Sequence, residues 1–100
     1  MENTKKLETQ LKKNSPANFK DTISNGIEFA KKYHEGQTRL SGEPYVNHVI
    51  RCANNLAQMG LETNTILGGL FHNILEKNSE KRAEISKILA KDFGEDVLNL

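Results

Sequence analysis

Two histidines carry the first chemical signal in this sequence. His48 and His72 fall in segments with helical spacing and lie among apolar residues. A neutral imidazole can bind a metal ion, but a single histidine on an apolar helical face is more often a hydrogen-bonded core residue. The sequence contains no HExxH or HxxxH pair that would favour a metal site. Histidine spacing alone therefore leaves both interpretations open.

A second chemical signal is the loop GQTRLSGEP, residues 36–44, which interrupts the helical pattern. It places Arg39 and Ser41 beside glycines. A guanidinium can bind phosphate or carboxylate oxygens with two hydrogen bonds, and glycine lets backbone N–H groups approach an anion closely. The segment suits phosphate recognition, and a plain solvated loop is the alternative. Glu76 and Lys77 end a later apolar segment, where such residues usually lie on the surface.

The elements that must position these residues are helices. Apolar residues recur at helical spacing, without the alternation typical of strands, which predicts an all-α bundle. Three predicted helices cover residues 15–34, 45–59 and 63–77, and Ser15 is the expected N-cap of the first. A fourth helix is expected to end at Gly94, and residues 95–100 are expected to begin a fifth. We expect residues 1–14 to form a polar tail or a loosely held helix, and residues 15–100 to form the N-terminal part of a domain.

Composition narrows the function classes. The net charge of +1 gives no general attraction to nucleic acid or to an anionic membrane. The one cysteine, Cys52, excludes a disulfide framework and a CxxC zinc site. No stretch has 18 apolar residues and no secretory signal is visible. These features predict a cytoplasmic protein.

Residues 29–78, FAKKYHEGQTRLSGEPYVNHVIRCANNLAQMGLETNTILGGLFHNILEKN, carry a family resemblance. They resemble the start of the hydrolase domain in RelA/SpoT-like proteins, FAxxxHxGQxRxSGEPYxxHPxxVAxxLAxxGLxxxTIxAALLHDxxED. Residues 90–100, AKDFGEDVLNL, are similar to the family's next segment, FGxxVxxLV. The resemblance implies an orthogonal helical bundle of the HD-domain type, truncated here after four to five helices.

The resemblance also implies an activity. Such domains use a divalent metal, usually manganese, to remove the 3′-diphosphate from guanosine tetra- and pentaphosphate, and a synthetase domain often follows. Arg39 and Ser41 match the loop that contacts the nucleotide, although Leu40 stands where the family has a basic residue. His34 matches a position that is not a ligand.

The metal ligands of the family match this sequence only in part. His48 and His72 stand at the two histidine ligands, and Asn73 replaces the aspartate ligand. Glu76 keeps one acid of the pair that supports the attacking water, whereas Lys77 replaces the other. The family's last ligand, an aspartate, would lie beyond Leu100.

These replacements predict impaired hydrolysis. In a site of two neutral imidazoles and two carboxylates, the carboxylates nearly balance the charge of the manganese ion. The bound ion in turn lowers the pKa of its water ligand. Asn73 offers an oxygen without negative charge, and Lys77 adds a positive charge, so we expect a domain that is structural or regulatory to a synthetase. Two alternatives stay open: an active 3′-pyrophosphohydrolase completed by residues beyond Leu100, and a helical interaction module without nucleotide chemistry.

Overall fold

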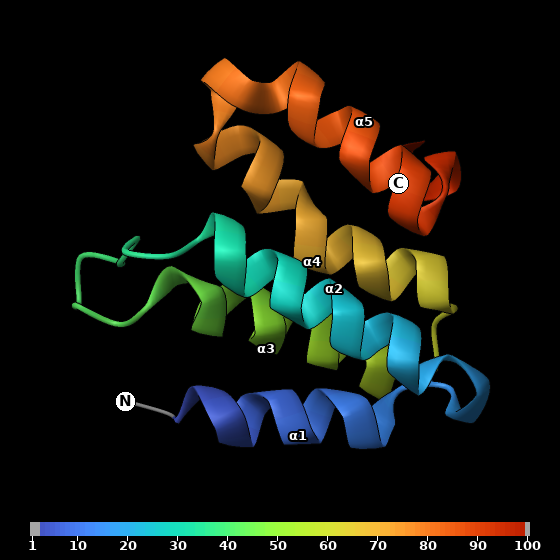
Figure 1. Cartoon of the computed structure of the whole chain (residues 1–100). Coiled ribbons are helices and arrows are strands. Elements are labelled where there is room, and N and C mark those ends of the chain that lie inside the picture. The colour runs from blue at the N-terminus through green and yellow to red at the C-terminus, as the bar shows by residue number, and fades with distance from the viewer. Residues whose placement is uncertain (1–2, 100) are drawn as a thin grey trace.

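The computed structural model describes residues 3–99, which form an all-α fold (Figure 1). Its helices are α1 (Thr4–Asn14), α2 (Lys20–Tyr33), α3 (Tyr45–Gln58), α4 (Thr63–Lys77) and α5 (Arg82–Phe93). Short 3-10 turns cover Ala17–Phe19, Ser79–Lys81 and Glu95–Asn99. The predicted fold class is confirmed. None of the described helices is long and apolar enough to cross a membrane.

Helix α4 lies at the centre of the bundle, packed against both α2 and α3. Its apolar residues supply much of the core and are almost completely buried: Ile66, Leu67, Leu70, Phe71 and Ile74. Gly26 of α2 allows the close approach, because a Cβ there would lie 2.9 Å from Leu67 Cδ2 and 3.2 Å from Leu70 Cδ1. Burial of this apolar face is the main force that holds the helices together.

Helix α1 is part of the same core. Its side chains Leu7 and Leu11 are 2% and 0% exposed and pack with the apolar residues of the other helices. At its end Asn14 Nδ2 donates a hydrogen bond of 2.9 Å to Asn54 Oδ1 of α3. The polar segment at the start of the chain is therefore a helix that covers one side of α3 (Figure 1).

The start of α2 differs from the sequence prediction. Ser15 ends α1, where its Oγ donates a 2.6 Å hydrogen bond to the Leu11 carbonyl, instead of capping the next helix. A 3-10 turn follows, and α2 begins at Lys20. The predicted ends at Gly60 and Gly94 are confirmed. Both glycines have positive φ, 75° and 91°, a conformation that glycine adopts without strain.

The helix ends that carry the candidate site residues lie at one edge of the bundle. In Figure 1 the starts of α1 and α3 and the ends of α2 and α4 lie on the same side, from which residues 34–44 project. This arrangement follows from the antiparallel run of α2, α3 and α4. It brings the loop near the last turn of α4.

Candidate functional site

The loop between α2 and α3 is a hydrogen-bonded turn. The Arg39 N–H donates to the Glu43 carbonyl at 2.9 Å, and the Gly42 N–H donates to the Arg39 carbonyl at 2.8 Å. Gly42 has a φ of 88°, which a residue with a side chain would adopt only with strain. The turn ends where the Tyr45 N–H donates to the Gln37 carbonyl at 2.9 Å. The backbone thus holds the exposed Arg39 and its neighbours at the tip.

A hollow of about 570 Å³ lies between this loop and the end of α4. We call it the loop hollow. It is lined by Thr38, Arg39, Leu40, Ser41, Tyr45 and Lys77. The Lys77 Nζ lies 4.9 Å from the centre of the Tyr45 ring, within reach of a cation–π contact. Three residues singled out from the sequence, Arg39, Ser41 and Lys77, therefore share one hollow.

His48 opens into a neighbouring hollow of about 420 Å³. Arg39 lines this hollow as well, together with Arg51 and Cys52, so it joins the two. The His48 Nε2 lies 3.9 Å from Cys52 Sγ. Partial burial, followed by the charges of Arg39 and Arg51, lowers the pKa of His48, and the charge of Glu43 opposes this shift. The imidazole is therefore mostly neutral at pH 7 and keeps a lone pair.

An ion pair fixes the base of the loop to α3. Glu43 is 8% exposed, and its two carboxylate oxygens accept hydrogen bonds of 2.6 Å from the two terminal nitrogens of Arg51. The hydrogen bonds from Arg51 are the main cause that lowers the Glu43 pKa to about 2. The carboxylate stays ionised at neutral pH and its charge is matched by Arg51. It therefore adds little net negative charge beside Arg39.

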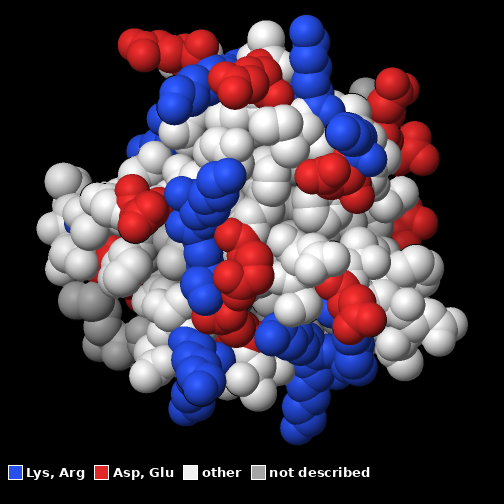
Figure 2. Space-filling view, in the orientation of Figure 1, with Lys and Arg blue, Asp and Glu red and all other residues white. Residues whose placement is uncertain are grey.

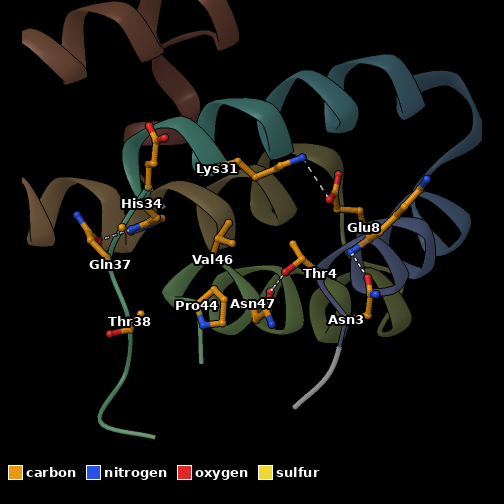
Figure 3. Close-up of a pocket in the computed structure, with 13 residues that line it drawn as sticks. Asn3, Thr4, Glu8, Lys31, His34, Gln37, Thr38, Pro44, Val46 and Asn47 are labelled. Carbon is orange, nitrogen blue, oxygen red and sulfur yellow. Dashed lines mark hydrogen bonds and ion pairs between the residues drawn. The ribbon is translucent and has the colours of Figure 1, made fainter. Parts of the chain in front are cut away.

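His34 lies behind the loop, beside a third hollow of about 880 Å³ near the start of α1 (Figure 3). The ring is 3% exposed, and its Nδ1 is 2.7 Å from the Gln37 Oε1. Its Nε2 has no hydrogen-bond partner among the described residues. Burial is the main cause that lowers the His34 pKa; the Gln37 hydrogen bond opposes it, and the charge of Lys77 adds to it. His34 thus behaves as a neutral core residue.

The remaining predicted residues lie on α4. His72 and Glu76 are exposed and Asn73 is partly buried. None of the three lines the loop hollow or the hollow of His48. Helices α3 and α4 pack against each other, but no described contact joins His48 to His72. The expected approach of the two rings stays a prediction.

The described side chains do not make a complete manganese site. Between residues 3 and 99, no group of three or more His, Cys, Asp or Glu side chains is placed to hold a metal ion. Manganese prefers carboxylate and other oxygen ligands. The resemblance led us to expect a ligand at Asn73, whose amide oxygen carries no charge. The described residues therefore do not supply a donor set that fits a divalent metal.

Charge on one face of the molecule is mixed. Figure 2 shows Lys and Arg side chains interspersed with Asp and Glu over the face in view. This agrees with the net charge of +1. On that face there is no broad basic surface of the kind that binds nucleic acid through many phosphates. The two cations of the loop hollow are a local feature.

Sequence reasoning missed Tyr45 and the contact between Cys52 and His48. Tyr45 and Cys52 lie on the same helical face as His48, which the sequence did single out. The spacing i, i+3 and i+7 was therefore a usable signal. The pairing of Glu43 with Arg51 had no comparable signal, because Glu43 lies in the loop before the helix starts. Only the folded turn brings its carboxylate back over α3.

Comparison with known proteins places these observations in a family context. The family described as "HD domain" matches residues 26–100. The chain is 37% identical over 79 residues to the guanosine-3′,5′-bis(diphosphate) 3′-pyrophosphohydrolase of Borreliella burgdorferi, covering 79% of this chain and 11% of the relative. It is 33% identical over 78 residues to the probable enzyme of that name from Mycoplasma pneumoniae, covering 78% and 11%.

A third relative combines two activities in its name. The bifunctional (p)ppGpp synthase/hydrolase SpoT of Escherichia coli is 36% identical over 66 residues, covering 66% of this chain and 9% of the relative. The chain thus spans about a tenth of the length of the curated relatives it matches. No solved structure matches it with significance.

Proposed function

Because this chain belongs to the HD-domain family, as a RelA/SpoT-like hydrolase domain, we propose that it binds guanosine tetra- or pentaphosphate but hydrolyses it poorly. Its role is then structural or regulatory towards a synthetase domain. A relative named as a bifunctional synthase/hydrolase and another named GTP pyrophosphokinase support the link to a synthetase. A cytoplasmic location suits the free thiol of Cys52.

The observation that carries the proposal is the position of Lys77. In the family pattern this position is acidic, and the acid supports the water that attacks the diphosphate. Here a lysine lies at the loop hollow beside Arg39 and Ser41. A cation cannot accept the proton of that water, whereas it can attract a phosphate group. The replacement therefore favours binding of the nucleotide over its hydrolysis.

Asn73 supports the same proposal. When manganese is bound in the family, it supplies an activated water for hydrolysis. An asparagine at a ligand position provides one neutral oxygen, so a divalent ion is held with less charge compensation. His48 and His72 remain the expected histidine ligands, and Glu76 the acid expected to support the water. With this donor set we expect weak affinity for manganese and slow hydrolysis.

The test measures binding and turnover on the same protein. Calorimetry with guanosine tetraphosphate should show binding, and a diphosphate-release assay with manganese should show negligible turnover. Brisk turnover would instead support the active 3′-pyrophosphohydrolase. Absence of both binding and turnover would favour the helical interaction module. Adding the synthetase domain to the assay would then show whether the nucleotide-bound domain changes its rate.

A further inference from the structure

We propose that the loop hollow is a metal-independent site for a diphosphate group, held between Arg39 of the loop and Lys77 at the end of α4. This inference rests on the proposed nucleotide binding and deepens it, because it names the part of the ligand that this hollow takes. In this proposal Lys77 binds the anion directly, in addition to replacing the acid that the family has at this position. The anion is either the diphosphate of a guanine nucleotide or free pyrophosphate.

The charges in the hollow favour an anion. Arg39 and Lys77 both line it, and neither forms an ion pair with any described residue. The nearest acid along the loop, Glu43, is instead paired with Arg51 through two hydrogen bonds of 2.6 Å. The hollow is therefore lined by two cations that have no ion-pair partner among the described residues, and the one acid that acts on Arg39 electrostatically, Glu43, is already paired with Arg51. A diphosphate group can bind both cations at once.

The neutral groups around the hollow match the same ligand. Helix α3 begins at Tyr45, a lining residue, so the positive end of its dipole lies near this hollow. The Tyr45 N–H itself is already bonded to the Gln37 carbonyl, so the helix end contributes through its dipole and not through this donor. Thr38 and Ser41 add hydroxyl groups that can donate to phosphate oxygens. A volume of about 570 Å³ leaves room for a diphosphate and part of a nucleotide.

Lys77 is oriented towards this hollow by its own contacts. Its ammonium group lies 4.9 Å from the centre of the Tyr45 ring, which holds the side chain over the start of α3. The charge of Lys77 is also close enough to contribute to the lowered pKa of His34, after the larger effect of burial. Lys77 thus acts at the base of the loop, although it lies far from Arg39 in the sequence.

Calorimetry with inorganic pyrophosphate tests the inference, with EDTA present to remove divalent ions. The wild-type chain should bind pyrophosphate, and added salt should weaken the binding because the contacts are ionic. Lys77→Met should weaken it on the order of tenfold, the effect of losing one charge-assisted contact. Lys32→Met is the matched control, because Lys32 Nζ also lies over a tyrosine ring, Tyr33 at 5.4 Å, but does not line the loop hollow.

A parallel titration with guanosine tetraphosphate separates this inference from the proposed function. If the nucleotide binds while Lys77→Met changes neither titration, the diphosphate site is refuted and nucleotide binding stands. If pyrophosphate binds through Lys77 and the nucleotide does not bind, the diphosphate site stands and the proposed nucleotide function fails. Pyrophosphate binding that requires manganese would overturn the metal-independent site. Circular dichroism of each variant confirms that the helices are intact.

Discussion

The carboxylate of Glu43 and the guanidinium of Arg51 form a two-pronged ion pair, with both oxygen–nitrogen distances at 2.6 Å. Glu43 closes the loop and Arg51 lies two turns into α3, so the pair fastens the candidate binding loop to the helical bundle. Glu43 is largely shielded from water, at 8% exposed, whereas the Arg51 side chain is 30% exposed. The loop is therefore anchored at its base, while Leu40 at its tip is fully exposed.

This ion pair predicts a specific loss of stability in acid. The Glu43 pKa is about 2 in the folded chain and 4.5 without its neighbours, so the stabilisation is complete above pH 4.5. It is lost as the pH falls from 4.5 towards 2, because the carboxylate then takes up a proton. Glu43→Gln should lower the melting temperature at pH 7, and the difference from wild type should shrink over that range. Thermal melts across pH measure this.

Glu84→Gln is the control for that pH series, since Glu84 is an exposed acid on α5 and the substitution removes the same charge. It should leave the melting temperature nearly unchanged. A constant difference between Glu43→Gln and wild type from pH 7 to pH 2 would contradict the role given to the ion pair.

Leu11→Ala tests how firmly α1 is held. The side chain is fully buried, so its truncation should lower the free energy of unfolding by about 2–5 kcal/mol. Urea unfolding followed by circular dichroism gives this value. Lys13→Ala, an exposed change on the same helix, should alter it by less than about 0.5 kcal/mol. Equal effects of the two variants would show that α1 does not contribute to the core.

Arg39→Ala should weaken the binding of guanosine tetraphosphate by about tenfold, because it removes a guanidinium that can hold phosphate oxygens with two hydrogen bonds. Calorimetry measures the change. Arg82→Ala removes an exposed arginine of α5 that lines neither hollow beside the loop, and it should have no effect. Unchanged affinity in the Arg39 variant would mean that the loop is only a connector between α2 and α3.

Much of the helical fold could be predicted from the sequence, because apolar periodicity and glycine stops are local signals. Helices α3 and α4 begin where expected, at Tyr45 and Thr63, and α5 ends before Gly94. The start of α2 could not be placed from Ser15, since a serine hydroxyl can cap the start of one helix or bond to the last carbonyls of another. In the structure the hydroxyl bonds to the Leu11 carbonyl, one turn back in α1.

The candidate site was predictable only in its parts. Arg39 and Ser41 could be singled out from the loop composition, and Lys77 from the departure at the end of a helix. Their common hollow depends on how α4 crosses α3, which no local pattern records. For the same reason the sequence could not show that Tyr45 would lie beneath Lys77. The predicted placement of His72 and Asn73 beside His48 still requires a test.

Restoring the two missing acids tests the proposed loss of hydrolysis. Asn73→Asp combined with Lys77→Asp returns two carboxylates to the site in which His48 and His72 are the expected histidine ligands. Each carboxylate adds negative charge that a divalent ion requires, and the second replaces a repelling ammonium group. In the whole protein, the double variant should therefore bind manganese more tightly than wild type, and some release of diphosphate from guanosine tetraphosphate should appear.

Two measurements decide this last prediction: calorimetry with manganese and a diphosphate-release assay on the same preparations. The control Asn25→Asp with Lys87→Asp makes the same change in net charge at exposed positions of α2 and α5. If the control gains as much manganese affinity, the effect is one of overall charge and not of a restored site. Brisk turnover by the wild type would refute impaired hydrolysis outright.

Because Lys77→Asp also removes a cation from the loop hollow, pyrophosphate binding in EDTA should fall in the double variant while manganese affinity rises. That opposite movement would separate the two roles of this position.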